Sequence, residues 1–375
     1  MAEYFKLEEM IAMQTAIPCT LMRGGTSRGP YFLASDLPAD EAVRDQVLLS
    51  VMGSPDIRQI DGIGGATPVT SKVAIISPSD HPQADVDYLF AQVSIEQALV
   101  DTAPSCGNIL SGVGPFAIEN RLVEAQDGET LVRIRNVNTD SLIEAIVQTP
   151  GSRVEYEGST SIDGIPGTAA PVLLNFKEIV GSKTGALLPT GNLKDMVEGV
   201  EVSCVDVSVP MVLIAATSLG KNGHESKAEL DEDKVFLEHI ERIRLAAARL
   251  MGMGDVSGKV VPKVGLLSSP RKGGNITSRY FVPTSCHPSH AVTGAICISV
   301  ATALKGSLAG ELARHEDNLP SQCVIEHPSG HIAITLDLES GGELVNVNSA
   351  GVVRTTRKLF SGQVFVPASV WDGNL

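Results

Sequence analysis

Two cysteines precede apolar, glycine-containing segments and are candidates for proton-transfer chemistry. Residues 105–118, which contain Cys106, align without gaps with residues 285–298, which contain Cys286. The N-terminus of a helix stabilises anions and lowers the pKa of a thiol, so a cysteine there can act as a base or help to bind an anionic ligand. The alternative for Cys106 is a buried core cysteine beside a tight contact between helix and sheet.

Two lysines occupy matching positions upstream of these segments. Lys72 and Lys263 each stand directly before a run of four apolar or small residues that predicts a strand. A lysine at the edge of a dry cleft has a lowered pKa and can serve as a general base. A strand-end lysine in solvent is the alternative, but the repeated order of lysine and cysteine favours a duplicated fold whose halves share one active site.

Candidate substrate-binding groups surround these positions. Arg23 and Arg28 bracket a glycine-rich stretch that lacks the spacing of a phosphate-binding P-loop. Arginine can hold a carboxylate in a bidentate manner, although a single arginine in a loop is more often solvated. The second half offers Ser278 and Arg279. The full set of predicted substrate-binding residues is Arg23, Thr26, Ser27, Gly107, Asn108, Ser278, Arg279, Cys286, Thr293 and Gly294.

The two halves differ immediately after the cysteines. Gly107 aligns with His287, and Asn108 aligns with Pro288, which has no N–H to donate. The second half must therefore bind a ligand differently from the first. This asymmetry favours a directional proton shuttle over a racemase with two equivalent thiols.

Histidines near Cys286 raise the question of a metal site. His287 and His290 follow it closely, but this Cys-His-x-x-His spacing matches no zinc pattern with a complete ligand set. His327 and His331 flank a Pro-Ser-Gly turn and are interpreted as turn residues. The sequence predicts no metal site.

The elements that must position these residues are mostly strands. Apolar runs between turn residues predict strands at residues 16–22, 31–33, 73–76, 86–93, 131–137, 142–148, 172–176, 200–207 and 211–216. Residues 23–29 are expected to form a polar loop between the first two strands. Helices are predicted at residues 39–52, 106–120, 229–251 and 291–304. The second of these is apolar nearly all round, which implies enclosure by a curved sheet, and the fourth is its expected counterpart.

Size and composition narrow the class of protein. A chain of 375 residues exceeds what one hydrophobic core usually supports, so we predict two domains, residues 1–185 and 186–375, with a C-terminal strand that can return to the first domain. The net charge of -15 argues against a nucleic-acid partner, and no apolar run is long enough for a membrane span. The six cysteines form no Cys-x-x-Cys pair and follow no secretory leader, so a cytoplasmic location is expected. A homodimer would cover exposed strand edges.

Five motifs, taken in order, resemble the family of methylaconitate cis-trans isomerases and 4-oxalomesaconate tautomerases. They are residues 22–29, 59–65, 70–73, 106–109 and 326–330, and the resemblance covers nearly the full length after Ala16. It implies the α+β diaminopimelate epimerase-like fold: two similar domains, each a curved, mostly antiparallel sheet around a central helix. It also implies Lys72 and Cys106 as the acid–base pair in the cleft between the domains, without metal, flavin or pyridoxal cofactor.

The implied activity is an allylic 1,3-proton shift on an unsaturated tricarboxylate. Residues 52–55, 85–92 and 188–192 resemble the 4-oxalomesaconate tautomerase branch, which serves protocatechuate and gallate breakdown. Isomerisation of 2-methylaconitate in propionate metabolism is the alternative reaction, and an inactive polycarboxylate-binding protein is the alternative of another class. Which of Lys72 and Cys106 is the base stays open.

Overall fold

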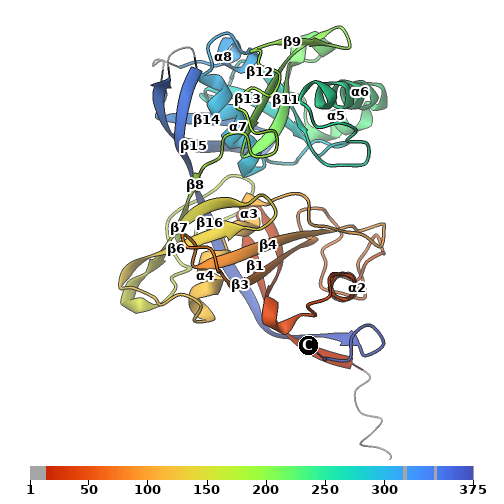
Figure 1. The fold of residues 1–375 in the computed structure, drawn as a ribbon, viewed down its shortest axis with the longest axis vertical. Coiled ribbons are helices and arrows are strands. Elements are labelled where there is room, and N and C mark those ends of the chain that lie inside the picture. Colours follow the sequence, from red (N-terminus) through yellow and green to blue (C-terminus); the bar gives the residue numbers. More distant parts are fainter. Residues whose placement is uncertain (1–13, 316–318, 342–343, 375) are drawn as a thin grey trace, which may run out of the picture.

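The computed structural model describes residues 14–315, 319–341 and 344–374, which form two lobes stacked along the long axis of the molecule (Figure 1). The first lobe contains β1 (Gln14–Gly24), β2 (Ser27–Leu33), β3 (Lys72–Pro78), β4 (Val86–Val93), β5 (Val100–Asp101), β6 (Gly128–Asn136), β7 (Ser141–Thr149) and β8 (Pro171–Lys177). The second contains β9 (Asp195–Val197), β10 (Val200–Val207), β11 (Val209–Ala215), β12 (Lys263–Ser268), β13 (Ile276–Phe281), β14 (Gln322–His327) and β15 (Gly330–Gly341). The long strand β16 (Leu344–Pro367) belongs to both lobes.

The helices lie inside or outside these sheets. The first lobe has α2 (Glu41–Met52), α3 (Gly107–Leu110) and α4 (Val113–Glu119), and the second has α5 (Lys227–Glu232), α6 (Lys234–Leu250), α7 (Val292–Thr302) and α8 (Leu308–Leu312). Every residue of α3 and α7 is buried, because the curved sheet of each lobe encloses its helix. No helix in the described part of the chain is both long enough and apolar enough to span a membrane.

The two lobes repeat one strand topology. The successive pairings β1–β2, β2–β3, β3–β4, β4–β6, β6–β7 and β7–β8 are antiparallel, parallel, antiparallel, parallel, antiparallel and antiparallel. The pairings from β10–β11 through β15–β16 have the same series. The duplicated α+β fold is therefore confirmed. Lys72 and Lys263 are the first residues of the equivalent strands β3 and β12.

Strand β16 joins the lobes. Its first part pairs with β15, its middle with β8, and its last part with β1. Since β1 also begins the series that ends at β8, this last part closes the first sheet into a barrel around α3 and α4. The division of the chain at residues 185 and 186 stays a prediction, and residues 1–13 of the first predicted domain lie outside the described residues.

Most predicted elements are confirmed, with three corrections. Residues 106–120 form two short helices instead of one, and residues 229–251 form α5 and α6, because the side chain of Asp233 caps a new helix by accepting from the Phe236 N–H at 3.0 Å. The predicted polar loop at 23–29 is a tight hairpin in which Arg23 pairs with Arg28 across β1 and β2. Gly25, at φ 50°, permits this short connection.

Candidate active site

Cys106 immediately precedes the first turn of α3 and lies against the inner face of β4. It is the N-cap residue, with extended backbone, and is 8% exposed. The hydroxyl of Tyr88 donates to the carbonyl of Cys106 at 3.3 Å. The thiol is therefore carried by a buried segment with a fixed backbone.

Lys72, the first residue of β3, packs its side chain on the adjacent strand β4. Its ammonium nitrogen is 5.0 Å from the ring centroid of Phe90 and donates to Oε1 of Gln92 at 2.8 Å. Residues two apart on a strand share a face, so Tyr88, Phe90 and Gln92 point to the same side of β4. The Cys106 backbone carbonyl contacts Tyr88, and the Lys72 ammonium contacts Phe90 and Gln92, so both predicted acid–base residues lie against the same face of β4.

The side chain of Gln92 is itself held in place. Its Nε2 donates to the carbonyls of Ser71 at 2.8 Å and Pro68 at 3.2 Å. On the other side of Lys72, a Cβ added to Gly29 would lie only 1.7 Å from the Lys72 carbonyl oxygen. The lysine is thus positioned by an amide bridge and by close packing of two backbones.

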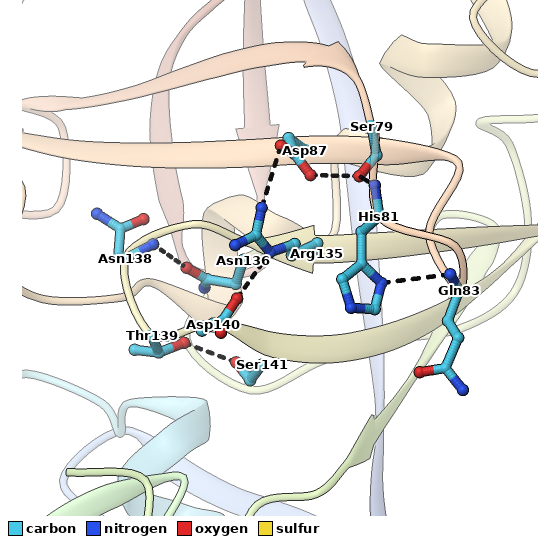
Figure 2. A network of polar contacts seen from close by, with 10 residues as sticks. All are labelled: Ser79, His81, Gln83, Asp87, Arg135, Asn136, Asn138, Thr139, Asp140 and Ser141. Carbon is cyan, nitrogen blue, oxygen red and sulfur yellow. Dashed lines mark hydrogen bonds and ion pairs between the residues drawn. The ribbon is translucent and has the colours of Figure 1, made fainter.

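A polar network fixes the segment that leads to Cys106. Asn136, at the end of β6, donates to the hydroxyl of Ser105 at 2.5 Å. Its Oδ1 accepts from the N–H of Asn138 at 3.0 Å (Figure 2). Asn138 in turn accepts from the Phe90 N–H and donates to the carbonyls of Phe90 and Thr102. One turn therefore ties β4 to the approach to the thiol.

The hairpin between β1 and β2 contributes further polar groups. Asn108 donates to the hydroxyl of Thr26 at 3.1 Å, and Gly25 packs so closely on Asn108 that an added Cβ would lie 2.2 Å from its Oδ1. Within the described chain, neither Asn108 Oδ1 nor Ser27 Oγ has a hydrogen-bond partner, although both are buried. Buried polar atoms are normally paired, so these two are available to a ligand.

The second lobe supplies a second lysine beside the first. Lys263 is 6% exposed, and burial followed by the nearby charge of Lys72 lowers its pKa to about 7. Burial and then Lys72 also lower the pKa of His287 to about 3. Both groups therefore lie within electrostatic reach of Lys72.

A histidine pair extends this group. His290 shares a hydrogen bond of 3.1 Å with the hydroxyl of Ser278, and its ring centroid lies 6.4 Å from that of His327. Burial is the main cause that lowers the pKa of His290 to about 3 and of His327 to about 4. Both are neutral at neutral pH. No group of three His, Cys, Asp or Glu side chains in the described ranges is placed to hold a metal ion.

The predicted position of Cys286 needs correction. The N-cap of α7 is Ala291, so Ala291, not Cys286, is the structural counterpart of Cys106. Cys286 lies among Phe236, Phe281 and other residues of the apolar cluster around α6, and burial raises its pKa to about 12. The structure therefore does not bring this thiol to the lysines.

The two predicted arginines are also engaged elsewhere. Arg279 follows Ser278 on β13 and so faces the opposite side of the sheet, where its Nε donates to the carbonyl of Glu225 at 2.6 Å. Arg23 donates to the carbonyls of Gly25 at 3.0 Å and Thr355 at 2.9 Å. Both guanidinium groups donate hydrogen bonds to backbone carbonyls, so neither is placed as a ligand for a substrate carboxylate.

The remaining predicted residues lie where the helices of the two lobes meet. Thr293 and Gly294 are in the first turn of α7, and a Cβ on Gly294 would be 2.2 Å from the ring of Tyr280. Gly107 faces Val292, so α3 and α7 contact each other at their N-terminal ends. The structure thus brings together Lys72, Cys106, Gly107, Asn108, Thr26, Ser27, Ser278, Thr293 and Gly294.

The sequence interpretation missed His290, His327 and Lys263 as site residues. The two histidines were considered only as metal ligands or turn residues. Lys263 carried a usable signal, because it repeats the position of Lys72 before an equivalent strand.

Two lobes that repeat one topology around buried helices define a racemase- and epimerase-like fold. A solved hydroxyproline epimerase from Agrobacterium vitis aligns over 96% of this chain and 95% of its own, with a TM-score of 0.56 at 13% identity, which supports the fold alone. The crystal structure of a methylitaconate-delta-isomerase aligns over 96% of this chain and 97% of its own, with a TM-score of 0.79 and 36% identity.

Residues 14–367 match the model of the PrpF protein family, and the chain belongs to this family. A 4-oxalomesaconate tautomerase of Pseudomonas putida is 50% identical over 96% of this chain and 99% of its own length. An Escherichia coli (strain K12) protein designated as an isomerase without a stated substrate is 54% identical over 94% and 99%. A 2-methyl-aconitate isomerase of Shewanella oneidensis is 33% identical over 94% and 98%. The protein is an isomerase.

Proposed function

We propose that the protein catalyses an allylic 1,3-proton shift on an unsaturated tricarboxylate, with 4-oxalomesaconate as its substrate. The observation that carries this proposal is that Lys72 and Cys106 both lie against one face of β4, Lys72 on Phe90 and Gln92 and Cys106 on Tyr88. The substrate assignment is supported by 50% identity to a relative named 4-oxalomesaconate tautomerase.

The chemistry needs one base and one acid. In one direction Lys72, as the neutral amine, removes a proton from the carbon next to the conjugated system, and the electron pair of the C–H bond enters an extended enolate. Cys106 then donates its proton at the far end of the allyl system, and the double bond moves. The reverse assignment uses the same two groups with their roles exchanged, and in both cases the substrate keeps its atoms and its oxidation state.

The enolate must be stabilised while it exists. Preorganised hydrogen-bond donors directed at developing negative charge are usually the largest contribution to such catalysis. Ser27 can donate through its unpartnered hydroxyl, and the backbone N–H groups of the first turn of α3 lie beside Cys106. These groups supply stabilisation without a further proton transfer.

A time course by NMR in deuterated buffer tests the proposal. The protein is incubated separately with 4-oxalomesaconate and with 2-methylaconitate, and double-bond migration and deuterium uptake are followed together. Isomerisation of the first substrate with deuterium uptake supports the proposal. Silence with both substrates contradicts it, and an inactive polycarboxylate-binding protein would give that result.

A second candidate is the isomerisation of 2-methylaconitate, which the same acid–base pair could perform. It is favoured by the relative of that name, although at only 33% identity. Activity on 2-methylaconitate alone in the NMR experiment would select it.

Assembly and location are part of the same proposal. A homodimer stays a prediction, and size-exclusion chromatography with light scattering tests it. A cytoplasmic location is supported by six cysteines that are all free and buried.

A further inference from the structure

Arg354 is a buried cation on the inner face of β16. It is 7% exposed and sits two residues after Val352, which belongs to the core enclosed by the barrel. Alternate residues of a strand share a face, so Arg354 also points inward. This part of β16 is the segment that passes from the second lobe into the first.

No anionic side chain neutralises this arginine in the described structure. Its NH1 donates to the carbonyl of Val353 at 3.0 Å, and its buried Nε has no partner. No ion pair joins Arg354 to an Asp or Glu among the residues described. Burial lowers its pKa to about 10, so the guanidinium still carries its charge at neutral pH. A buried charge without a counter-ion is costly, and a fold that keeps one needs a reason.

The surroundings of Arg354 belong to the candidate active site. The charge of Arg354 contributes to lowering the pKa of both His290 and His327, so the guanidinium lies within electrostatic reach of both rings. These neutral rings cannot neutralise it. The next residue, Thr355, accepts from the N–H of Gly25 at 3.0 Å, and Gly25 packs on Asn108.

Two of the other arginines considered as carboxylate ligands, Arg23 and Arg279, differ from Arg354 in their hydrogen bonds. Arg23 and Arg279 spend their donors on backbone carbonyls, at 2.9 Å to Thr355 and 2.6 Å to Glu225. Arg354 has a buried Nε without a partner in the described chain. The Nε of Arg28 is also unpartnered, but Arg28 as a whole is less buried than Arg354.

We infer that Arg354 binds one carboxylate of the substrate, beside the neutral rings of His290 and His327. This inference rests on the proposed function, because it assigns a residue to a polycarboxylate at the same site. Arg354 is a binding residue and takes no part in the proton shift.

The test measures binding and turnover in four proteins: wild type, Arg354→Gln, Arg354→Lys and Arg357→Gln. Arg357 is the matched control, because it lies on the same strand but is exposed and pairs with Glu157 at 3.8 Å. Calorimetry with tricarballylate, a saturated tricarboxylate that cannot tautomerise, gives Kd. The NMR assay with 4-oxalomesaconate gives kcat and KM.

The expected result is a Kd and KM raised by about 10- to 100-fold in Arg354→Gln, the range for one lost hydrogen bond to a charged group. Arg354→Lys is expected to recover part of the loss, and Arg357→Gln to match wild type. Thermal unfolding without ligand checks the fold, and Arg354→Gln is expected to unfold no earlier than wild type because it removes an unpaired charge. If the glutamine variant fails to fold, the lysine variant carries the test, with a smaller increase expected in both constants.

A ligand pair locates the contact. Glutarate lacks the central carboxylate of tricarballylate, and methylsuccinate lacks one terminal carboxylate. The substitution of Arg354 is expected to cost less binding for one of these two than for tricarballylate, because the partner is already missing. Equal costs for all three ligands would overturn the inference.

The outcomes separate the two proposals. If wild type isomerises its substrate and Arg354→Gln matches Arg357→Gln in Kd and KM, the inference fails and the proposed function stands. If wild type binds tricarballylate through Arg354 but isomerises neither substrate, the proposed function fails and the inference stands. If wild type neither binds nor isomerises, both fail.

Discussion

Gly107 lies against Val292, and this contact joins the N-terminal ends of α3 and α7. A Cβ added to Gly107 would fall 2.6 Å from the Cβ of Val292, an atom fixed to the backbone of α7. The two lobes can therefore approach this closely only with glycine at position 107. The same approach brings Lys263 and His287 of the second lobe near Lys72 of the first.

Substitution of Gly107→Ala is expected to push the helix ends apart. Overpacking of this kind typically lowers the free energy of unfolding by about 1–3 kcal/mol. Because the acid–base groups are also displaced, kcat should fall even under conditions in which the variant is fully folded. The control is Gly351→Ala, where the nearest atoms to an added Cβ are 3.7 Å away. Denaturant unfolding and the NMR assay measure both effects, and equal kcat in the two variants would contradict the prediction.

Substitution of either proposed acid–base residue should remove the proton shift while leaving binding in place. Lys72→Met and Cys106→Ser are each expected to lower kcat by at least about 100-fold, the usual contribution of a positioned proton-transfer group. Calorimetry with tricarballylate should show that Cys106→Ser still binds. If both variants retain turnover within a few fold of wild type, the assignment of these residues is wrong.

Substitution of Gln92, the amide partner of Lys72, is expected to change the pH dependence of catalysis. Gln92→Glu places a carboxylate where the Gln92 Oε1 accepts from Lys72 at 2.8 Å, which favours the protonated, inactive amine as base. Where Lys72 acts as the base, the acidic limb of the profile, along which activity rises as the base loses its proton, should move to higher pH. A pH profile of kcat/KM for Gln92→Glu against wild type measures this, and superimposable profiles would exclude Lys72 as the base.

Lys263 should make stability depend on pH in a defined window. Its pKa is lowered from 10.5 to about 7, by burial first and by Lys72 and Arg244 next, while Asp101 opposes the shift. The unfolded chain therefore binds one more proton than the folded chain between about pH 7 and 10.5. Stability contributed by this group rises with pH across that window, and the full penalty applies below it.

Lys263→Met is expected to abolish this rise. Its free energy of unfolding should exceed that of wild type below pH 7 by at most about 5 kcal/mol, and the advantage should vanish near pH 10.5. Urea unfolding at several pH values measures it, with Lys259→Met at an exposed position as the control. A difference that does not change with pH would show that Lys263 is charged throughout.

Local patterns were sufficient to predict most strands, because the apolar runs and the turn residues that bound them can be recognised within a few consecutive residues. They also indicated the equivalence of Lys72 and Lys263, since both begin a buried strand. The alignment of Cys106 with Cys286 failed because the segment after Cys286 is not helical: the His287 N–H returns to the carbonyl of Tyr280 at 2.7 Å, and α7 begins only after Ala291.

The sequence predicts that a C-terminal strand can return to the first domain, but the side chains that this closure buries cannot be read from short segments. Arg354 stands in a strand whose sequence would suit a solvated arginine, and it is buried only because β16 passes between β8 and β1. Arg279 was assigned to the site although it directly follows Ser278, and strand alternation does not allow both to face one side. The polar residues of the active site depend on which faces the two lobes turn toward each other, and no short segment contains that information.

Asn136 should prove to be a positioning residue for Cys106. It is 1% exposed, and its side chain links the hydroxyl of Ser105 to the N–H of Asn138. Figure 2 shows its contact with Asn138. Asn136→Ala leaves these buried groups unpaired and should cost about 1–3 kcal/mol of stability. Because the segment before the thiol loses its support, kcat should fall while KM for the tricarboxylate changes little.

The neighbouring Thr139→Ala is the control, since the hydroxyl of Thr139 shares a hydrogen bond of 2.6 Å with that of Ser141 within the same turn. It should leave kcat close to that of wild type and change the free energy of unfolding by no more than about 0.5 kcal/mol. A loss of stability in Asn136→Ala without any loss of kcat would mean that this turn supports the fold and leaves the position of the thiol unchanged.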